Sequence, residues 1–208
     1  SLSLLQDQVF GPVTKRQARF LQLSSQEVER VSALLNRLLL ASSMDEQGLA
    51  LNLSPHSVGD LIRESLERLQ PNAEAKGVQV HVLDTAGNPT VHADRDHLQQ
   101  ALVNLVGNAI KFSPDKGAVH IGVDPPEAGK GVVVTISDQG PGIPEGDRPF
   151  VFDRFYRGEG VRTKVDGSGL GLNISRRIIA AHGGELWLKD GVSAGTTFCF
   201  SLPAGTRT

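Results

Sequence analysis

Cysteine, methionine, tryptophan and tyrosine are scarce in this sequence, with one residue of each among 208. A single cysteine, Cys199, excludes an internal disulfide. Its alternating, strand-like surroundings predict a core or edge residue rather than a nucleophile, in a chain suited to a reducing compartment. No apolar run reaches the roughly 18 residues that a membrane span needs, and no signal-peptide pattern is present. The net charge is −2 and the pI about 6.3, so we expect neither nucleic-acid binding nor membrane contact.

The chain also lacks two common nucleotide-binding motifs. No Gly-x-x-x-x-Gly-Lys-Ser/Thr sequence occurs, which excludes a P-loop. Residues 167–171 are Gly-Ser-Gly-Leu-Gly, a spacing that differs from the Gly-x-Gly-x-x-Gly of dinucleotide-binding folds. The overall composition, with 39% hydrophobic and 21% charged residues, is that of an ordinary globular protein of one or two domains.

Two glycine clusters nevertheless organise the second half of the chain. Asp-Gln-Gly-Pro-Gly-Ile at 138–143 follows a strand-like run, and Gly-Ser-Gly-Leu-Gly-Leu at 167–172 leads into a helical pattern. Glycine lets the backbone approach a ligand closely. A glycine turn before a helix also presents free N–H groups and the positive end of the helix dipole to an anion. On this pattern alone, the clusters are either a ligand site or two loops without a ligand.

Hydrophobic periodicity predicts a two-layer α+β sandwich over residues 54–206. Three helices are expected at 57–69, 94–111 and 170–182, and five strands at 78–82, 119–123, 132–137, 186–188 and 196–202. We expect Pro125 to Gly131 to form a hairpin loop between the second and third strands. The third helix should end at His182-Gly183-Gly184, with His182 in a structural role.

The first 48 residues have a different pattern. A short helical stretch ends at Gly11-Pro12, and a helix of about 30 residues follows, with Thr14 and Gln17 as a capping box at its start. Apolar residues three and four apart form a seam along this helix. We predict a helical hairpin over 1–48 that pairs with a second copy in a four-helix bundle, followed by a linker as far as Pro55. The alternative is a single helix packed on its own globular domain.

The helix predicted at 94–111 carries polar residues suited to chemistry. Asn104 and Asn108 are four residues apart and share one face, and Lys111 lies on the same side. Asparagine is costly to bury without partners, its amide oxygen is a ligand that suits Mg²⁺, and lysine suits phosphate. For this helix alone, a solvated polar face is the alternative.

Five segments, in this order, closely resemble the sequence boxes of sensor histidine kinases. They are Asn104-Leu-Val-Gly-Asn108-Ala-Ile-Lys111-Phe (N box), Asp138-Gln-Gly140-Pro-Gly142 (first G box), Val151-Phe152-Asp-Arg-Phe155-Tyr156-Arg157-Gly (F box), Gly167-Ser-Gly169-Leu-Gly171-Leu (second G box) and Gly195-Thr196-Thr197-Phe198 (third G box). Residues 1–55 resemble the dimerisation hairpin of these kinases, so the resemblance covers essentially the whole chain. It implies the mixed-sheet ATP-binding sandwich shared with gyrase, mismatch-repair and chaperone ATPases, with ATP and Mg²⁺ as cofactors.

The resemblance also implies a role for each matching position. Asp138 would accept the adenine amino hydrogen, and Asn108 with Asn104 would hold Mg²⁺. Lys111 and Arg157 would act with the two asparagines in catalysis by contacting the phosphates. The other positions expected around the nucleotide are Gly140, Gly142, Ile143, Phe155, Tyr156, Gly167, Ser168, Gly169, Leu170, Gly171, Leu172 and Thr196.

One position separates a kinase from a water-hydrolysing ATPase. Hydrolysis needs a carboxylate to activate water, and gyrase-like relatives carry it in the N box, where this sequence has Asn104. The resemblance therefore implies a homodimeric kinase that passes the γ-phosphate of ATP to a His and then to an Asp of a response regulator. It would act in the cytoplasm, whether or not the whole protein is membrane-anchored. A conformational ATPase and a non-enzymatic dimerising scaffold are the alternatives.

The phosphate acceptor is where the sequence departs from the family. Histidine kinases carry it on the first hairpin helix, whereas residues 1–45 contain no histidine. The chain also begins with Ser1 rather than Met. We expect that the acceptor helix is truncated and that this chain binds ATP without phosphorylating itself. A degenerate kinase without an acceptor is the second interpretation.

Overall fold

A computed structural model describes residues 49–85, 87–127, 131–158, 168–189 and 195–204, together with Thr14, Gln17, 19–21 and Ser24. The chain divides into two compact units, Ser1–Ser42 and Ser43–Thr208. The hairpin predicted over 1–48 lies almost entirely outside the described residues. At its expected second helix, the Gln17 N–H donates to Thr14 Oγ1 at 3.3 Å and the Thr14 N–H donates to Gln17 Oε1 at 2.9 Å. These reciprocal bonds confirm the predicted capping box.

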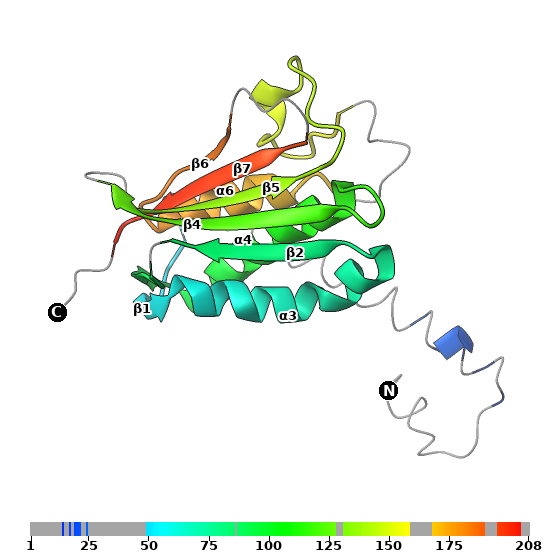
Figure 1. Ribbon diagram of the computed structural model, residues 1–208, viewed down its shortest axis with the longest axis horizontal. Coiled ribbons are helices and arrows are strands. Elements are labelled where there is room, and N and C mark those ends of the chain that lie inside the picture. The colour runs from blue at the N-terminus through cyan, green and yellow to red at the C-terminus, as the bar shows by residue number, and fades with distance from the viewer. Residues whose placement is uncertain are drawn as a thin grey trace. The chain divides into compact units, whose positions relative to one another are not determined.

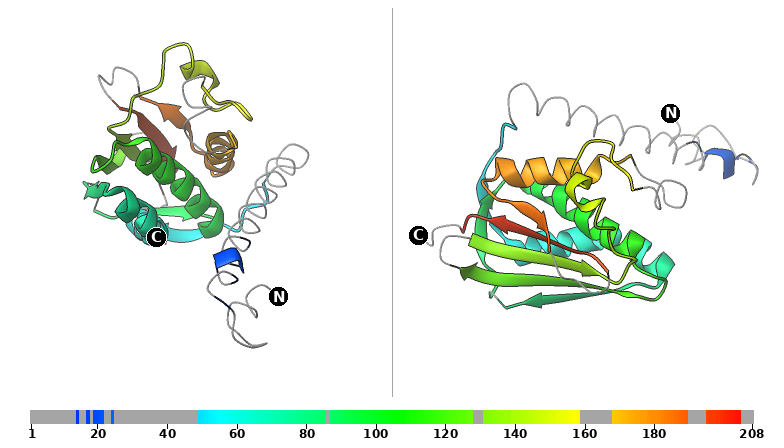
Figure 2. Two further views of the ribbon diagram at one scale, coloured as in Figure 1. Left: turned by 90° about the vertical axis from the view of Figure 1, so that its right-hand side faces the viewer. Right: turned by 90° about the horizontal axis from the view of Figure 1, so that it is seen from above.

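The second unit is built on a five-stranded mixed sheet with the strand order β2-β4-β5-β7-β6. The strands are β2 (Gln79–Asp84), β4 (Ala118–Glu127), β5 (Gly131–Asp138), β6 (Leu186–Leu188) and β7 (Thr197–Leu202). β2 pairs with β4 in parallel, and the other pairs in this sheet are antiparallel. Three helices, α3 (Val58–Lys76), α4 (Arg95–Phe112) and α6 (Gly171–Ala181), lie on one face of the sheet (Figure 1 and Figure 2). This arrangement confirms the predicted two-layer α+β sandwich.

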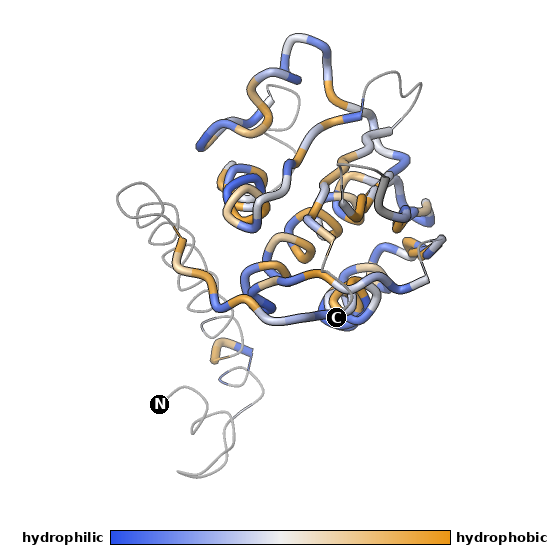
Figure 3. The backbone as a smooth tube through the Cα atoms, turned by 90° about the vertical axis from the view of Figure 1, so that its left-hand side faces the viewer, coloured by the Kyte–Doolittle hydropathy of each residue, from blue (hydrophilic) through white to orange (hydrophobic). Residues whose placement is uncertain are grey.

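Alternation along the strands decides which side chains enter the core. On β5, Val132, Val134, Ile136 and Asp138 are buried, and the residues between them are half-buried. The apolar face predicted for α4 is buried throughout and consists of Leu98, Leu102, Leu105, Val106 and Ile110. Along the helices, hydrophobic and hydrophilic positions are also interspersed (Figure 3). Because α4 packs against β5, the alternation also turns one carboxylate, that of Asp138, toward the helix layer.

Cys199 and His182, which we expected to be structural residues, are both buried. Cys199 is buried in β7, which confirms a core position, and burial raises the pKa of its thiol. His182 is the C-cap of α6 and is buried. In the part of the chain that the structure describes, no helix has the length and apolarity needed to cross a bilayer.

A two-stranded ribbon was not predicted. β1 (Ser54–Ser57) pairs antiparallel with β3 (Thr90–Ala93), so the end of the expected linker is a strand. Neither segment shows a strong alternating apolar pattern. What defines the ribbon is tertiary pairing across more than thirty residues, which local periodicity does not report.

Two predicted boundaries were wrong, both at prolines. α3 continues beyond Leu69 through Pro71 to Lys76, and Gly77 ends it with a φ of +67°. The contact of Lys76 Nζ with the carbonyls of Ile110 and Lys111, at 3.2 and 2.5 Å, anchors this last turn against α4 and offsets the hydrogen bond that proline removes. In β4, the strand extends over Pro125 and Pro126 to Glu127 with a register shift after Asp124, so the hairpin loop is shorter than expected. Such irregularities at strand ends tolerate proline.

Candidate nucleotide-binding site

Asp138 ends β5 and is only 6% exposed. Its Oδ1 accepts hydrogen bonds from the Gly140 N–H at 2.8 Å and the Thr196 N–H at 3.1 Å. Its own N–H donates to the Thr196 carbonyl at 2.8 Å. Burial raises the pKa of this carboxyl, and the two hydrogen bonds to Oδ1 oppose that effect. Because the bonds from described residues all go to Oδ1, Oδ2 can accept a hydrogen bond from a ligand.

The loop before Thr196 requires glycine. Gly195 has a φ of +79°, and a Cβ there would collide with the carbonyl oxygen of Asp138. Gly142 lies beside the same backbone, because a Cβ on it would be 3.1 Å from the Gly195 carbonyl oxygen. The first and third glycine boxes are therefore packed together around one carboxylate.

The polar face of α4 lies beside this cluster and reaches α6. Asn104, Asn108 and Lys111 are all half-buried. The Nδ2 atom of Asn104 is buried and has no hydrogen-bond partner among the described residues. A Cβ on Gly171 would lie 3.7 Å from the Asn104 side chain, so the N box and the second G box meet at this point. The ammonium of Lys111 lies 5.5 Å from the centre of the Phe112 ring.

The N-terminus of α6 has no side-chain cap among the residues that the structure describes. Its N-cap residue, Leu170, is buried and provides no side-chain cap, while the Leu170 N–H donates to Ser168 Oγ at 3.4 Å. The N–H groups of the first three helical residues, Gly171 to Asn173, have no carbonyl within the helix to bind. These donors and the helix dipole favour negative charge. Gly167, which we expected here, lies outside the described residues.

The F-box segment reaches this helix end through its backbone. The Phe155 N–H donates to the Gly169 carbonyl at 3.0 Å, and a Cβ on Gly169 would approach the Phe155 carbonyl carbon to 2.7 Å. Phe155 has a φ of +61°, rare for a bulky residue, and its side chain is 59% exposed. Strain at such a position is typical of functional loops. Arg157 is half-buried in the same segment.

Sequence reasoning missed several residues that hold this segment. Asp147 Oδ1 accepts a 2.7 Å hydrogen bond from the Tyr156 hydroxyl, beside the short helix η1 (Arg148–Phe150). Asn173 Nδ2 donates to the Phe152 carbonyl at 2.8 Å, and the Arg176 guanidinium lies 5.2 Å from the centre of the Phe152 ring. A polar Asn in the first turn of an amphipathic helix was the available signal for Asn173. Nothing local pointed to Asp147.

The predicted residues thus gather in three groups. Asp138, Gly140, Gly142 and Thr196 form one, Asn104 and Gly171 a second, and Phe155 and Gly169 a third. The Ile143 carbonyl accepts from Arg148 Nε at 3.3 Å, so its backbone is bonded to η1, which precedes the F box. Asn108 shares the Asn104 face of α4 without a described contact to the other groups.

The side chains at the site also determine whether it could hold a metal ion. The described residues include no group of three or more His, Cys, Asp or Glu side chains that could hold one. An ion at this site would depend on amide oxygens and on the phosphates of a nucleotide. Mg²⁺ is commonly bound in this way, with few protein ligands and several phosphate or water oxygens. The half-buried Asn104 and Asn108 fit that requirement.

Comparison with known proteins agrees with this geometry. Residues 93–206 match the family described as "Histidine kinase-, DNA gyrase B-, and HSP90-like ATPase". The chain belongs to this family. The chain is 35% identical over 190 residues to the sensor histidine kinase WalK of Bacillus subtilis (strain 168), covering 89% of this chain and 30% of WalK. It is 31% identical over 182 residues to the adaptive-response sensory kinase SasA of Synechococcus sp. (strain JA-3-3Ab), covering 86% of this chain and 47% of SasA.

Solved structures place the domain more narrowly within the ATPase family. Full-length ShkA in complex with AMPPNP superposes with a TM-score of 0.82 at 28% identity, over the whole of this chain and 43% of ShkA. The mycobacterial sensor histidine kinase MprB gives 0.63 at 31% identity, over 73% of this chain and 97% of that chain. The described sandwich is an ATP-binding catalytic domain of the sensor histidine kinase type. The chain spans less than half the length of WalK and SasA.

Proposed function

We propose that this chain is the ATP-binding part of a sensor histidine kinase whose complete form transfers the γ-phosphate of Mg-ATP to a histidine. One observation carries the proposal. A buried carboxylate with one oxygen left for a ligand and an uncapped helix N-terminus lie at the glycine boxes of the same sandwich. The first suits a base with an amino group and the second suits phosphates.

Asp138 is proposed to select adenine. A carboxylate oxygen accepts hydrogen bonds and cannot donate them, so Oδ2 pairs with the 6-amino group of adenine and rejects the 6-oxo group of guanine. The bonds from Gly140 and Thr196 to Oδ1 hold the carboxylate in place for that contact. Gly142 and Ile143 complete the surroundings of the base.

The phosphates are proposed to lie along the start of α6. Ser168, Gly169 and the backbone from Leu170 to Leu172 provide the cradle, with Gly167 before them and Phe155 and Tyr156 on the covering segment. Lys111 and Arg157 balance phosphate charge, since neutralisation and positioning supply most of the catalysis in phosphoryl transfer. Asn108 and Asn104 would hold Mg²⁺, which when bound neutralises charge on the phosphate oxygens.

Transfer to a protein is favoured over hydrolysis because Asn104 cannot act as a base. The acceptor histidine is proposed to lie on a helix outside this chain's residues, because 1–45 contain none. A degenerate kinase without an acceptor is the second account of the same fact. A conformational ATPase would differ from both by releasing phosphate without an acceptor.

The partners follow from the same proposal. The hairpin over 1–48 would pair with a second copy, and the domain over 54–206 would carry the nucleotide. The histidine kinase ThkA has been solved in complex with the response regulator protein TrrA. We propose that a receiver-domain Asp of such a regulator takes the phosphate from the complete protein. Because ATP is a cytoplasmic metabolite, the domain is expected to act in the cytoplasm.

A titration of the full chain with a fluorescent ATP analogue, with and without Mg²⁺, tests the proposal. We expect saturable binding that Mg²⁺ strengthens and that Asn108→Ala makes insensitive to Mg²⁺. Asn72→Ala, at an exposed position on α3, is the matched control and should retain the Mg²⁺ effect. Phosphate release should stay at background, and steady turnover without an acceptor would favour the conformational ATPase. If the wild-type chain does not bind the analogue, the kinase proposal is wrong for this chain and the scaffold is favoured.

A further inference from the structure

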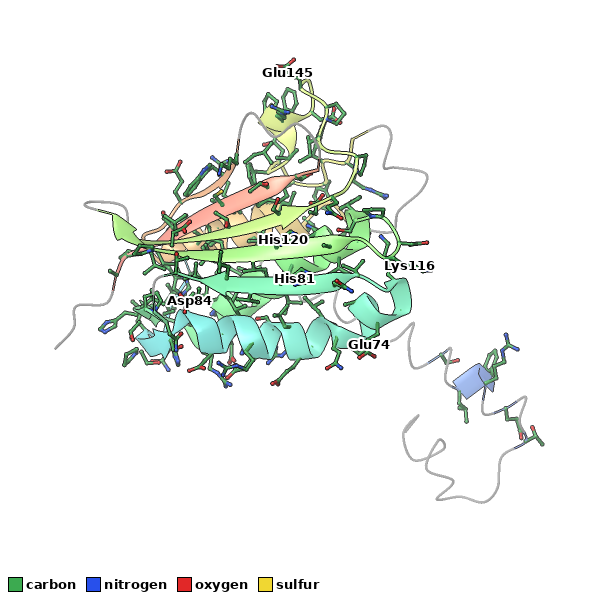
Figure 4. The ribbon with its side chains drawn as sticks, viewed as in Figure 1. Glu74, His81, Asp84, Lys116, His120 and Glu145 are labelled. Carbon is green, nitrogen blue, oxygen red and sulfur yellow. The ribbon has the colours of Figure 1, made fainter. Side chains whose placement is uncertain are left out.

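Two histidines form a pair on the face of the sheet opposite the helices. His81 on β2 and His120 on β4 are partner positions in the parallel ladder. Val119 and Ile121, on either side of His120, are buried in the core, so alternation turns His120 and its partner to the other face. Figure 4 shows the two residues side by side on these neighbouring strands.

The two imidazole rings are close and open to solvent. Their centres lie 5.2 Å apart, and their planes are inclined by 21°. Both residues are exposed. Within the described part of the chain, the two rings stack on each other, and neither imidazole has a hydrogen-bond or ion-pair partner. The ring nitrogens are therefore available to a ligand from solvent.

This separation suits one metal ion shared by two imidazoles. With metal–nitrogen bonds of about 2.0–2.1 Å at tetrahedral angles, two coordinating rings have centres roughly 5 Å apart. The ladder fixes both backbones, so binding requires only rotation of two exposed side chains, a fast motion. We propose that His81 and His120 form a binding site for a divalent transition-metal ion of the class that imidazole prefers, Zn²⁺, Ni²⁺ or Cu²⁺.

The site provides two protein ligands. The described residues bring no third His, Cys, Asp or Glu into such a group, so water completes the coordination. An ion held this way exchanges readily, and affinity follows the order of the divalent series, with Cu²⁺ above Ni²⁺ and Zn²⁺. The site is separate from the proposed nucleotide site, which lies toward the helix layer and offers oxygen ligands suited to Mg²⁺. It does not depend on the proposed kinase function.

Calorimetric titration of the tag-free full chain with NiCl₂, without nucleotide or chelator, tests the site. We expect one equivalent to bind, and His81→Ala and His120→Ala each to weaken binding at least tenfold because a single imidazole remains. His92→Ala, which removes an exposed histidine from β3, should leave binding unchanged, and millimolar Mg²⁺ should not compete. The proposal is overturned if the wild-type chain takes up no Ni²⁺, or if both substitutions leave the affinity unchanged. Circular dichroism of each variant verifies the fold.

Discussion

The backbone N–H of Asp94, at the start of α4, donates a 3.0 Å hydrogen bond to Nε2 of His182, at the end of α6. His182 Nδ1 is 2.7 Å from the Ile178 carbonyl, so a neutral ring with its proton on Nδ1 satisfies both contacts. The Asp94 carboxylate caps α4 through the His97 N–H and binds the preceding segment through the Asn52 N–H. This pair therefore fixes the relative position of the two helices that carry the N box and the second G box.

Replacement of His182 tests that role. We expect His182→Ala to lower the free energy of unfolding by about 2–4 kcal/mol, because it removes the acceptor of the Asp94 N–H and leaves a cavity beside α6. Urea unfolding at neutral pH measures the loss. His92→Ala, at an exposed position, is the control and should stay within about 0.5 kcal/mol of wild type. Equal values for the two variants would contradict a structural role for His182.

The loss of folding stability at acid pH should depend on Asp94. Burial opposes ionisation of this carboxyl, but hydrogen bonds from Asn52 and His97 outweigh burial and hold its pKa below the ordinary value. A lowered pKa in the folded state adds stability above the unfolded-state pKa, near 3.9, and that stability is lost as the pH falls through the folded-state value.

Asp94→Asn isolates this effect, because asparagine still caps a helix but does not titrate. We expect wild-type stability, followed by urea unfolding between pH 6 and pH 3, to fall more steeply below about pH 4 than that of the variant. Asp115→Asn, at an exposed position, should behave as wild type. Parallel curves for wild type and Asp94→Asn would rule the account out.

Gly195→Ala tests the packing of the third G box on the first. The substitution places a Cβ against the Asp138 carbonyl oxygen at a residue with a φ of +79°. Gly87 also has a positive φ, +68°, but a Cβ there meets open space, so Gly87→Ala measures the backbone cost alone. We expect about 1 kcal/mol from Gly87→Ala and at least about 2 kcal/mol more from Gly195→Ala. Similar losses in thermal or urea unfolding would show that the close approach is unimportant.

How far the sequence could predict the site depends on whether a signal was local. The i, i+4 spacing of Asn104 and Asn108, and the glycines around Asp138 and Gly169, are visible in short windows of residues. Such local patterns were enough to predict the polar face of α4 and the two glycine clusters. The partners of these residues are distant in the chain, such as Thr196 for Asp138 and Gly171 for Asn104. The resemblance to sensor histidine kinases, and not the spacing, led us to expect these distant segments in one site.

The fold shows the same difference between features with a local signal and features that depend on distant contacts. Strong periodicity predicted the five strands of the main sheet and its three helices. The β1–β3 ribbon depends on pairing between distant residues, and the extension of α3 through Pro71 depends on the contact of Lys76 with the end of α4. Likewise, Asp147 is a surface acid by sequence and becomes the partner of Tyr156 only through the fold. Tertiary contacts override local rules in each case.

The raised pKa of Asp138 predicts a cost to stability. In the folded state burial disfavours the charged carboxylate, so stability falls as the pH rises from the unfolded value toward the folded pKa, and the loss persists at neutral pH. We therefore expect Asp138→Asn to be at least as stable as wild type in the nucleotide-free state at pH 7.5. Thermal unfolding checks this expectation. A decrease in stability of more than about 1 kcal/mol would show that the hydrogen bonds to the charged carboxylate outweigh its burial.

The central claim is that Asp138 recognises adenine, and the affinities of wild type and Asp138→Asn for ATP and GTP test it most directly. Asparagine keeps the side-chain size, but it replaces one carboxylate oxygen with an NH₂ group. That NH₂ group must point either at the amino group of adenine or at the N–H donors of Gly140 and Thr196. We predict that wild type prefers ATP over GTP by about a hundredfold or more, and that Asp138→Asn loses at least tenfold in ATP affinity together with most of the preference. Asp124→Asn, exposed on β4, should match wild type. Equal wild-type affinity for ATP and GTP, or unchanged ATP binding by Asp138→Asn, would contradict the account.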